Sequence, residues 1–153
     1  MKIIPALLLV IVLMAFTDGK KLLTEKYGGS YSYGTDIEKE RIGSIDIYPE
    51  TDSSVLFYLD LNRGAPSYNM GAEYGRLVVK NDSAIYLAQS SDACKLLFTF
   101  LGKSIVIKSI NNSGCGYGGG VYADGSFYKD SDLVKSSFIN HQGDTIYFAS
   151  FKH

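Results

Sequence analysis

Residues 54–62, with the sequence SVLFYLDLN, alternate between two sets of side chains. One face carries Val55, Phe57, Leu59 and Leu61. Side chains of a strand point alternately to opposite faces, so this pattern predicts a β-strand with one buried face. Further short segments that suit strands follow one another along the chain: 27–34, 42–48, 74–80, 84–89, 94–101, 104–110, 121–123, 126–129, 133–138 and 145–151. No segment shows a sustained period of 3.6 residues, and the pattern therefore predicts an all-β protein.

Turn residues between these segments predict how the strands connect. We expect hairpins across 81–83, 102–103, 124–125 and 140–143, where Gly, Asn and Asp are concentrated. Gly64, Pro66 and Gly71 predict an irregular loop over 63–71. A chain of 153 residues suits one domain. We therefore predict a single small antiparallel β-barrel of about eight strands, a lipocalin-like or inhibitor-like meander, over residues 27–153.

The N-terminus predicts export. Lys2 precedes the uncharged run IIPALLLVIVLMAF, and polar TDGKK follows it. A positive start, an apolar run of this length and a polar exit are typical of a secretory signal peptide. We assign residues 1–17 to this peptide and 18–26 to a flexible segment, and we expect a periplasmic or secreted protein without a membrane span after cleavage. The alternative is an uncleaved membrane anchor.

Cys94 and Cys115 are the only cysteines. Export would place them in an oxidising compartment, and the sequence therefore predicts a structural disulfide between them. Free thiols and a redox pair are the alternatives, although a redox pair is more often CxxC. Two cysteines 21 positions apart with no neighbouring histidine are a poor zinc site, and we predict no metal and no cofactor.

The charge balance limits the kind of partner. Fifteen basic and 16 acidic residues give a net charge of −1. A nucleic-acid-binding protein needs a basic patch or stripe, so we expect no nucleic-acid partner. We predict a monomer that binds a protein partner or a small ligand in the bacterial envelope.

Candidates for catalysis are few. His141 with Asp144 and a serine could form a hydrolytic triad, but no GxSxG elbow is present. Asp60 and Glu73 are the carboxylates that could form a glycosidase pair. The glycine-rich stretch GCGYGGG lacks the Lys-Ser/Thr ending of a phosphate loop. We therefore predict that the protein is not an enzyme.

A binding surface is the stronger candidate. It consists of Arg63, Tyr68, Asn69, Met70 and Tyr117. Aromatic, Met and Arg side chains are enriched in interfaces, and loops on a β scaffold often carry them. The alternative is that Tyr68 and Met70 fold back as a plug over one end of the barrel.

Two motifs, LDLNRGAPSYNMG at 59–71 and CGYGGGVYADGSFYK at 115–129, together with Cys94 resemble a group of small exported bacterial β-barrel proteins of unknown function. In that group CGFG is typically followed by VYADG. Residues 64–68, GAPSY, also have a fainter similarity to the SGxxY loop of periplasmic lysozyme inhibitors, but they lack its Ser-Gly pair. The first resemblance implies an exported β-barrel, and the second implies an inhibitory loop.

These observations predict an exported non-enzymatic binding protein, with inhibition of a cell-wall-degrading enzyme as its most specific form. A carrier with an apolar cavity inside the barrel is one alternative. A hydrolase of envelope glycans or peptides is the other.

Overall fold

A computed structural model describes residues 22–88, 94–111 and 115–151. The predicted signal peptide, residues 1–17, lies outside this part. Ten strands and two short 3-10 helices form within it. In chain order they are η1 (Leu23–Tyr27), β1 (Gly29–Tyr33), β2 (Ile42–Pro49), β3 (Ser54–Asn62), β4 (Met70–Val78), β5 (Ser83–Leu87), β6 (Lys95–Phe100), β7 (Ser104–Asn111), β8 (Gly125–Ser131), β9 (Ser137–Ile139), β10 (Thr145–Tyr147) and η2 (Phe148–Ser150).

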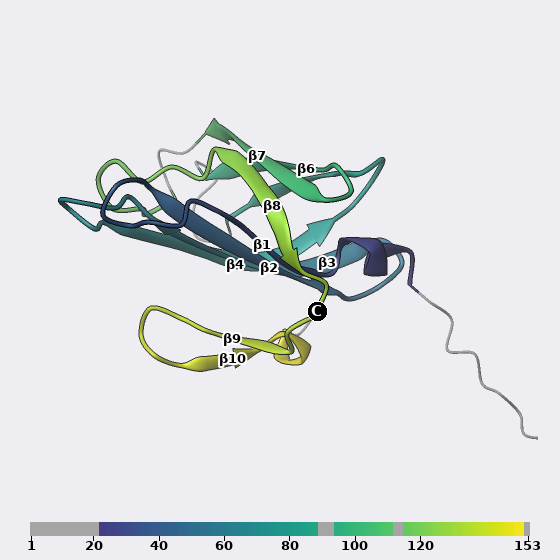
Figure 1. Ribbon diagram of the computed structural model, residues 1–153. Helices are drawn as coiled ribbons and strands as arrows, with labels where there is room; N and C mark the ends of the chain where they lie inside the picture. The colour runs from purple at the N-terminus through teal and green to yellow at the C-terminus, as the bar shows by residue number, and fades with distance from the viewer. Residues whose placement is uncertain (1–21, 89–93, 112–114, 152–153) are drawn as a thin grey trace, which may run out of the picture.

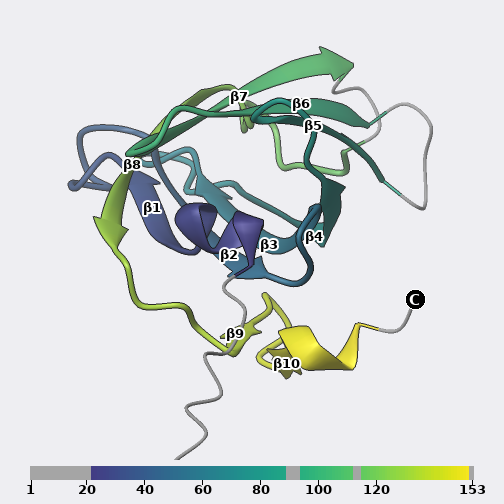
Figure 2. The same ribbon diagram turned by 90° about the vertical axis from the view of Figure 1, so that its right-hand side faces the viewer.

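Eight strands form one antiparallel sheet in the order β4-β3-β2-β1-β8-β7-β6-β5. The sheet curls into a nearly closed barrel, with β1–β4 on one side and β5–β7 on the other (Figure 1, Figure 2). Two four-stranded meanders are joined through the pairing of β1 with β8. The prediction of an all-β barrel of about eight meandering strands is confirmed.

The barrel remains open between β4 and β5. We expected a hairpin across 81–83, but only the bridge between Lys80 and Ser83 forms there, and this expectation was wrong. The side chain of Tyr86 crosses the gap, because its hydroxyl oxygen lies 2.9 Å from the Glu73 carboxylate and 3.3 Å from the carbonyl of Tyr74, both on β4. A Cβ at residue 75 would lie 2.8 Å from the Tyr86 ring, so Gly75 provides the space for that ring.

The hairpin expected at Asp124–Gly125 is also absent. Residues 121–124 form no strand, and Gly125 begins β8, which pairs with β7 and β1. The Asp124 carboxylate instead accepts hydrogen bonds from the backbone N–H of Ser109, at 3.0 Å, and from its hydroxyl. Pairing with strands distant in sequence has replaced the local turn.

Side chains fill the barrel along its length. The Tyr27 ring packs against that of Phe100 at one end, with ring centroids 4.5 Å apart. The Phe57 ring lies 5.0 Å from those of Tyr86 and Phe98 in the middle. At the opposite end Tyr33 meets Phe127 at 4.8 Å. These contacts make the interior a packed core.

The last hairpin, β9–β10, covers the outside of the barrel below β1–β4 (Figure 1). Phe138 of β9 stacks on Tyr58 of β3, with ring centroids 4.1 Å apart. Phe148 adds a ring contact to Phe138 at 5.2 Å and is fully buried. A second apolar cluster therefore attaches the C-terminal segment to the outer face of the sheet.

Residues 22–26 are the described part of the segment that we expected to be flexible. Residues 23–26 form most of the 3-10 helix η1. Thr24 is buried, and its hydroxyl donates to the carbonyl of Thr51 at 2.5 Å. Among the described residues, neither helical segment has the length and apolar character needed to cross a bilayer.

Candidate functional site

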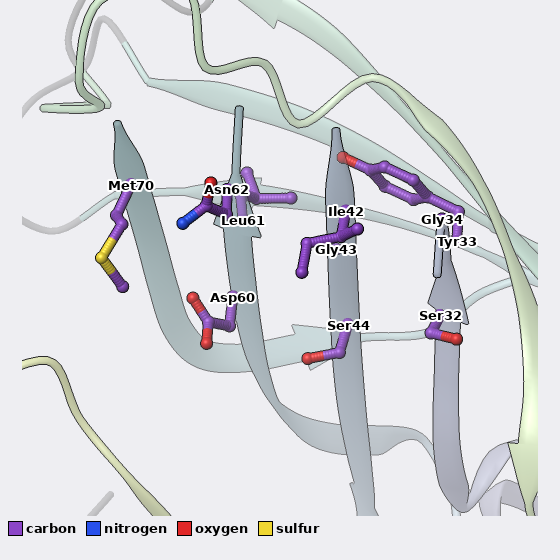
Figure 3. A pocket seen from close by; sticks show the side chains of 10 residues that line it. All are labelled: Ser32, Tyr33, Gly34, Ile42, Gly43, Ser44, Asp60, Leu61, Asn62 and Met70. Atoms are coloured by element: carbon purple, nitrogen blue, oxygen red, sulfur yellow. The ribbon is translucent and has the colours of Figure 1, made fainter. Parts of the chain in front are cut away.

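A groove of about 260 Å³ lies on the β1–β4 side of the sheet, at the end where β3 leads into the loop 63–69 (Figure 3). We call it the β1–β4 groove and define it by Ser32, Ile42, Ser44, Asp60, Asn62 and Met70. Its size is below the roughly 300 Å³ at which pockets for drug-sized ligands begin. The groove therefore suits one long side chain or one small ring.

Strand register arranges the groove in two rows. Ser32 pairs with Ser44, and Ser44 pairs with Asp60, so these polar residues lie side by side on adjacent strands. In the next row Ile42 pairs with Asn62, and Asn62 pairs with Met70. Paired residues on one face have Cβ atoms about 5 Å apart. The groove thus has a polar row beside a largely apolar row.

The polar row ends at an interaction with the C-terminal hairpin. His141 Nε2 lies 2.9 Å from Asp60 Oδ1. Asn140 shapes the turn that carries His141, since its Oδ1 accepts from the backbone N–H groups of Gln142 and Asp144 at 3.0 and 2.8 Å. The Asp60 side chain is still 39% exposed. One side of its carboxylate is therefore fixed while the residue remains accessible from the groove.

The loop 63–69 borders this groove and is held by its own backbone. The N–H of Arg63 donates to the carbonyl of Asn69, and the N–H of Tyr68 donates to that of Gly64, both at 2.9 Å. Gly64 has a φ of +79°, and a Cβ there would lie 2.3 Å from the carbonyl oxygen of Glu40. Any side chain at position 64 would displace the loop.

The glycine-rich segment supports the same loop. The Asn69 side-chain amide donates to the carbonyl of Gly119 at 2.7 Å, and the N–H of Gly118 donates to that of Met70 at 2.9 Å. Arg63 reaches the Gly119 carbonyl more weakly, at 3.4 Å. Two segments that are about 50 residues apart in sequence therefore form one surface.

Four of the five predicted binding residues lie on this surface. Tyr68 and Met70 are 40% and 47% exposed, and Arg63 is also exposed. Asn69 is half-buried against the glycine-rich segment. The Tyr68 hydroxyl donates to Glu38 at 2.6 Å, which orients its ring at the surface. Tyr68 and Met70 do not belong to the apolar core that fills the barrel.

Tyr117 has a different position from its predicted partners. Its ring packs over Gly71, where a Cβ would lie 2.6 Å from the ring. Its hydroxyl is buried without a hydrogen-bond partner among the described residues. Gly71 leaves the space for this ring. The irregular loop expected over 63–71 was wrong for Met70 and Gly71, because both residues belong to β4. Tyr117 thus closes the barrel end from within.

The predicted bond between Cys94 and Cys115 is confirmed. It connects the start of β6 to the glycine-rich segment. A Glu73 oxygen lies 3.8 Å from the sulfur of Cys94. The three residues come close enough to share an ion, but both sulfurs are consumed by the disulfide and offer no thiolate. The bond therefore acts here as a structural link behind the loop surface.

Glu73 is a carboxylate on the inner face of β4. It accepts a hydrogen bond from the Tyr86 hydroxyl at 2.9 Å. Burial raises the pKa of Glu73, and the hydrogen bond from Tyr86 partly opposes this effect. The folded protein consequently holds this proton at pH values where the unfolded chain has released it.

We expect the free energy of unfolding to fall as the pH rises from 4.5, the ordinary pKa of this carboxyl, through its raised value in the folded protein. The folded state binds more protons than the unfolded state over this window, so deprotonation favours unfolding. Glu73→Gln should flatten this part of the profile, measured by urea unfolding at several pH values. An unchanged profile in the variant would assign the effect to another group.

The carboxylates considered for glycosidase chemistry do not face each other. Asp60 pairs with Ala72, the residue before Glu73, and successive side chains of a strand point to opposite faces. Asp60 therefore faces the groove, while Glu73 faces the core. His141 contacts Asp60 rather than Asp144, the residue considered for a hydrolytic triad.

Sequence reasoning missed Ser32 and Ser44 and did not place Asp60 in a binding site. Ser32 and Ser44 are small polar residues on strands, where solvent exposure is the usual explanation. Only the register of β1, β2 and β3 brings them into one row, and register depends on contacts between strands.

The fold and this surface together define a small antiparallel β-barrel that presents a groove and a supported loop at one end. Comparison of the chain with family models, curated proteins and solved structures gives no match. The resemblance of the two motifs to exported bacterial barrels therefore stays a prediction.

Proposed function

We propose that this protein is a non-enzymatic binding protein that docks a protein partner with the loop 63–69 and the adjoining β1–β4 groove. The observation that carries the proposal is that Tyr68, on a loop already fixed by hydrogen bonds, and Met70, the first residue of β4, are both exposed. Exposed aromatic and methionine side chains supply contact area in interfaces. A loop fixed before binding loses less conformational entropy when the partner docks.

The predicted leader and the disulfide support a site of action in the periplasm or outside the cell. The partner is accordingly a protein of that compartment. The specific form of the proposal is inhibition of a cell-wall-degrading enzyme. It draws on the similarity of residues 64–68 to an inhibitory loop and on the link between Tyr68 and the groove, since the side-chain amide of Asn62 donates to the Tyr68 carbonyl at 3.4 Å.

The packed interior favours this proposal over a carrier. A carrier needs an internal cavity, whereas aromatic rings of the described residues meet across the barrel at 5.0 Å. Asp60 and Glu73 lie on opposite faces of the sheet. Glycoside hydrolysis needs two carboxylates beside one bond, so this arrangement favours binding over hydrolysis.

The test uses the protein purified in the form that the cell produces. It is immobilised as bait in envelope extract, and it is separately added to a muramidase acting on purified cell wall. Stoichiometric capture of one envelope protein or dose-dependent inhibition of the muramidase supports the proposal. Turnover of cell-wall glycan by the protein itself would replace it with the hydrolase alternative.

Tyr68→Ala should weaken binding to the captured partner by roughly 30-fold, the equivalent of about 2 kcal/mol for a central interface tyrosine. The thermal midpoint should remain nearly unchanged, because the side chain is 40% exposed and outside the core. Titration calorimetry and thermal unfolding measure the two effects.

Tyr147→Ala is the matched control, since Tyr147 is 57% exposed on β10 and is not among the residues that line the groove. It should leave both the affinity and the midpoint unchanged. A large fall in the midpoint of Tyr68→Ala with unchanged affinity would mean that Tyr68 supports the fold instead of contacting the partner.

A further inference from the structure

Three polar groups of the β1–β4 groove face its opening without a partner. They are Oδ2 of Asp60 and the hydroxyls of Ser44 and Ser32, and none has a hydrogen-bond partner within the described part of the chain. They come from adjacent strands, so the distance between strands, about 4.8 Å, sets their spacing. Figure 3 shows the three side chains on the same side of the sheet. The groove therefore presents a row of oxygen acceptors.

Charge decides what this row can bind. Asp60 is the acidic group among the lining residues, and the lining includes no lysine or arginine. His141 contacts only Oδ1 of the Asp60 carboxylate. A ligand that brings positive charge and several N–H donors to the free side of Asp60 would complement the groove, whereas an anion would meet the carboxylate without a counter-charge.

The second row of the groove matches an aliphatic chain. Ile42 and Met70 lie beside the polar row, on either side of Asn62. Arginine and lysine carry apolar stems that pack on such surfaces while the charged head remains hydrogen-bonded. The groove volume of about 260 Å³ is small for a larger ligand.

The geometry points to the β1–β4 groove as a receptor for an arginine side chain of the protein partner, with the guanidinium on Asp60 and Ser44 and the stem on Met70. Arginine suits this row better than lysine, because its planar head offers five donors in a fixed fork while an ammonium is a compact point charge. This inference rests on the proposed function, and it names the chemistry that the partner must present beside the surface that contacts Tyr68.

The experiment titrates N-acetyl-L-arginine methylamide into the protein purified as the cell produces it, with backbone amide shifts recorded by NMR. Saturable shifts should appear at Ser32, Ser44, Asp60 and Asn62, with a Kd on the order of millimolar for one side chain. The corresponding citrulline derivative has nearly the same shape without the charge. It should bind at least about tenfold more weakly.

Asp60→Asn should reduce affinity for the arginine probe by about tenfold or more, since it removes the charge but keeps the shape. Asp130→Asn is the matched control, because Asp130 is an exposed carboxylate on β8 outside this groove. It should leave the affinity unchanged. Equal binding of the arginine and citrulline probes to the wild-type protein would overturn the inference even if Asp60→Asn did not fold.

N-acetylglucosamine serves as a third probe, because a sugar ring could also use a row of oxygen acceptors. Saturable shifts at the same amides with this sugar, and none with the arginine probe, would overturn the inference in favour of a saccharide site. These results do not depend on finding the partner. If a partner is captured but the arginine probe does not bind, only the assignment of the groove is rejected. If the arginine probe binds but no partner is captured, only the proposed function is rejected.

Discussion

Phe57→Ala is expected to lower the free energy of unfolding by about 3–5 kcal/mol, the usual cost of removing a buried phenylalanine. Phe57 is fully buried, and its ring contacts those of Tyr86 and Phe98 at 5.0 Å each. Phe57 lies beside the gap between β4 and β5, which the side chain of Tyr86 crosses in place of backbone pairing. Removing Phe57 takes away the ring against which Tyr86 packs, and the gap should then close less well.

Urea unfolding followed by fluorescence or circular dichroism measures this effect. Phe57→Leu should cost substantially less than the alanine variant, because it leaves a smaller cavity. Leu101→Ala is the surface control, since Leu101 is largely exposed, and it should change stability by less than about 0.5 kcal/mol. A loss below about 1 kcal/mol for Phe57→Ala would contradict the packed interior that argues against a carrier.

The strands that pair with a sequence neighbour were the easiest to predict. The alternation in 54–62 predicted β3 with the bounds that the structure gives it. The hairpin across Gly102 and Lys103 also forms as expected, between β6 and β7. In these cases one segment or one turn carries most of the information, and the partner strand is close in the chain.

Pairings between distant segments could not be predicted in the same way. Asp124 and Gly125 favour a tight turn locally, yet β8 pairs with β1, about 100 residues earlier in the chain. The energy gained from two neighbouring strands outweighs a turn preference of one dipeptide. The edge between β4 and β5 shows the opposite case, where a good turn at Asn81 and Asp82 forms but the strands beyond it separate around Tyr86.

The candidate site likewise combines residues that one segment of the sequence indicates with residues whose position depends on distant segments. The sequence pointed to Arg63, Tyr68, Asn69 and Met70 because side chains of these types are conspicuous in a segment rich in glycine and proline, and they do lie on one surface. It could not place Tyr117, whose direction depends on the space that Gly71 leaves on β4, a strand far from Tyr117 in the chain. The row of Ser32, Ser44 and Asp60 depends on register alone, so no property of any one residue signals it.

Replacing both cysteines, Cys94→Ala with Cys115→Ala, is expected to lower the free energy of unfolding by about 3 kcal/mol. The bond closes a loop with a sequence separation of 21 residues, and the chain-entropy estimate for such a loop is about 3 kcal/mol. For a domain of this size the thermal midpoint should fall by roughly 10 °C. Thermal unfolding of the variant, compared with wild type under non-reducing conditions, measures the loss.

The same variant tests how the disulfide contributes to binding. Cys115 lies next to the segment whose Gly118 and Gly119 hold Met70 and Asn69. Without the bond this support should fluctuate more, and the partner should then bind more weakly because the loop must be ordered on docking. A dithiol reductant added to the wild-type protein should reproduce both effects, and it should leave the stability and affinity of the double variant unchanged. If the variant loses stability but binds the partner as tightly as wild type, the loop 63–69 is held by its own hydrogen bonds and the disulfide serves the fold alone.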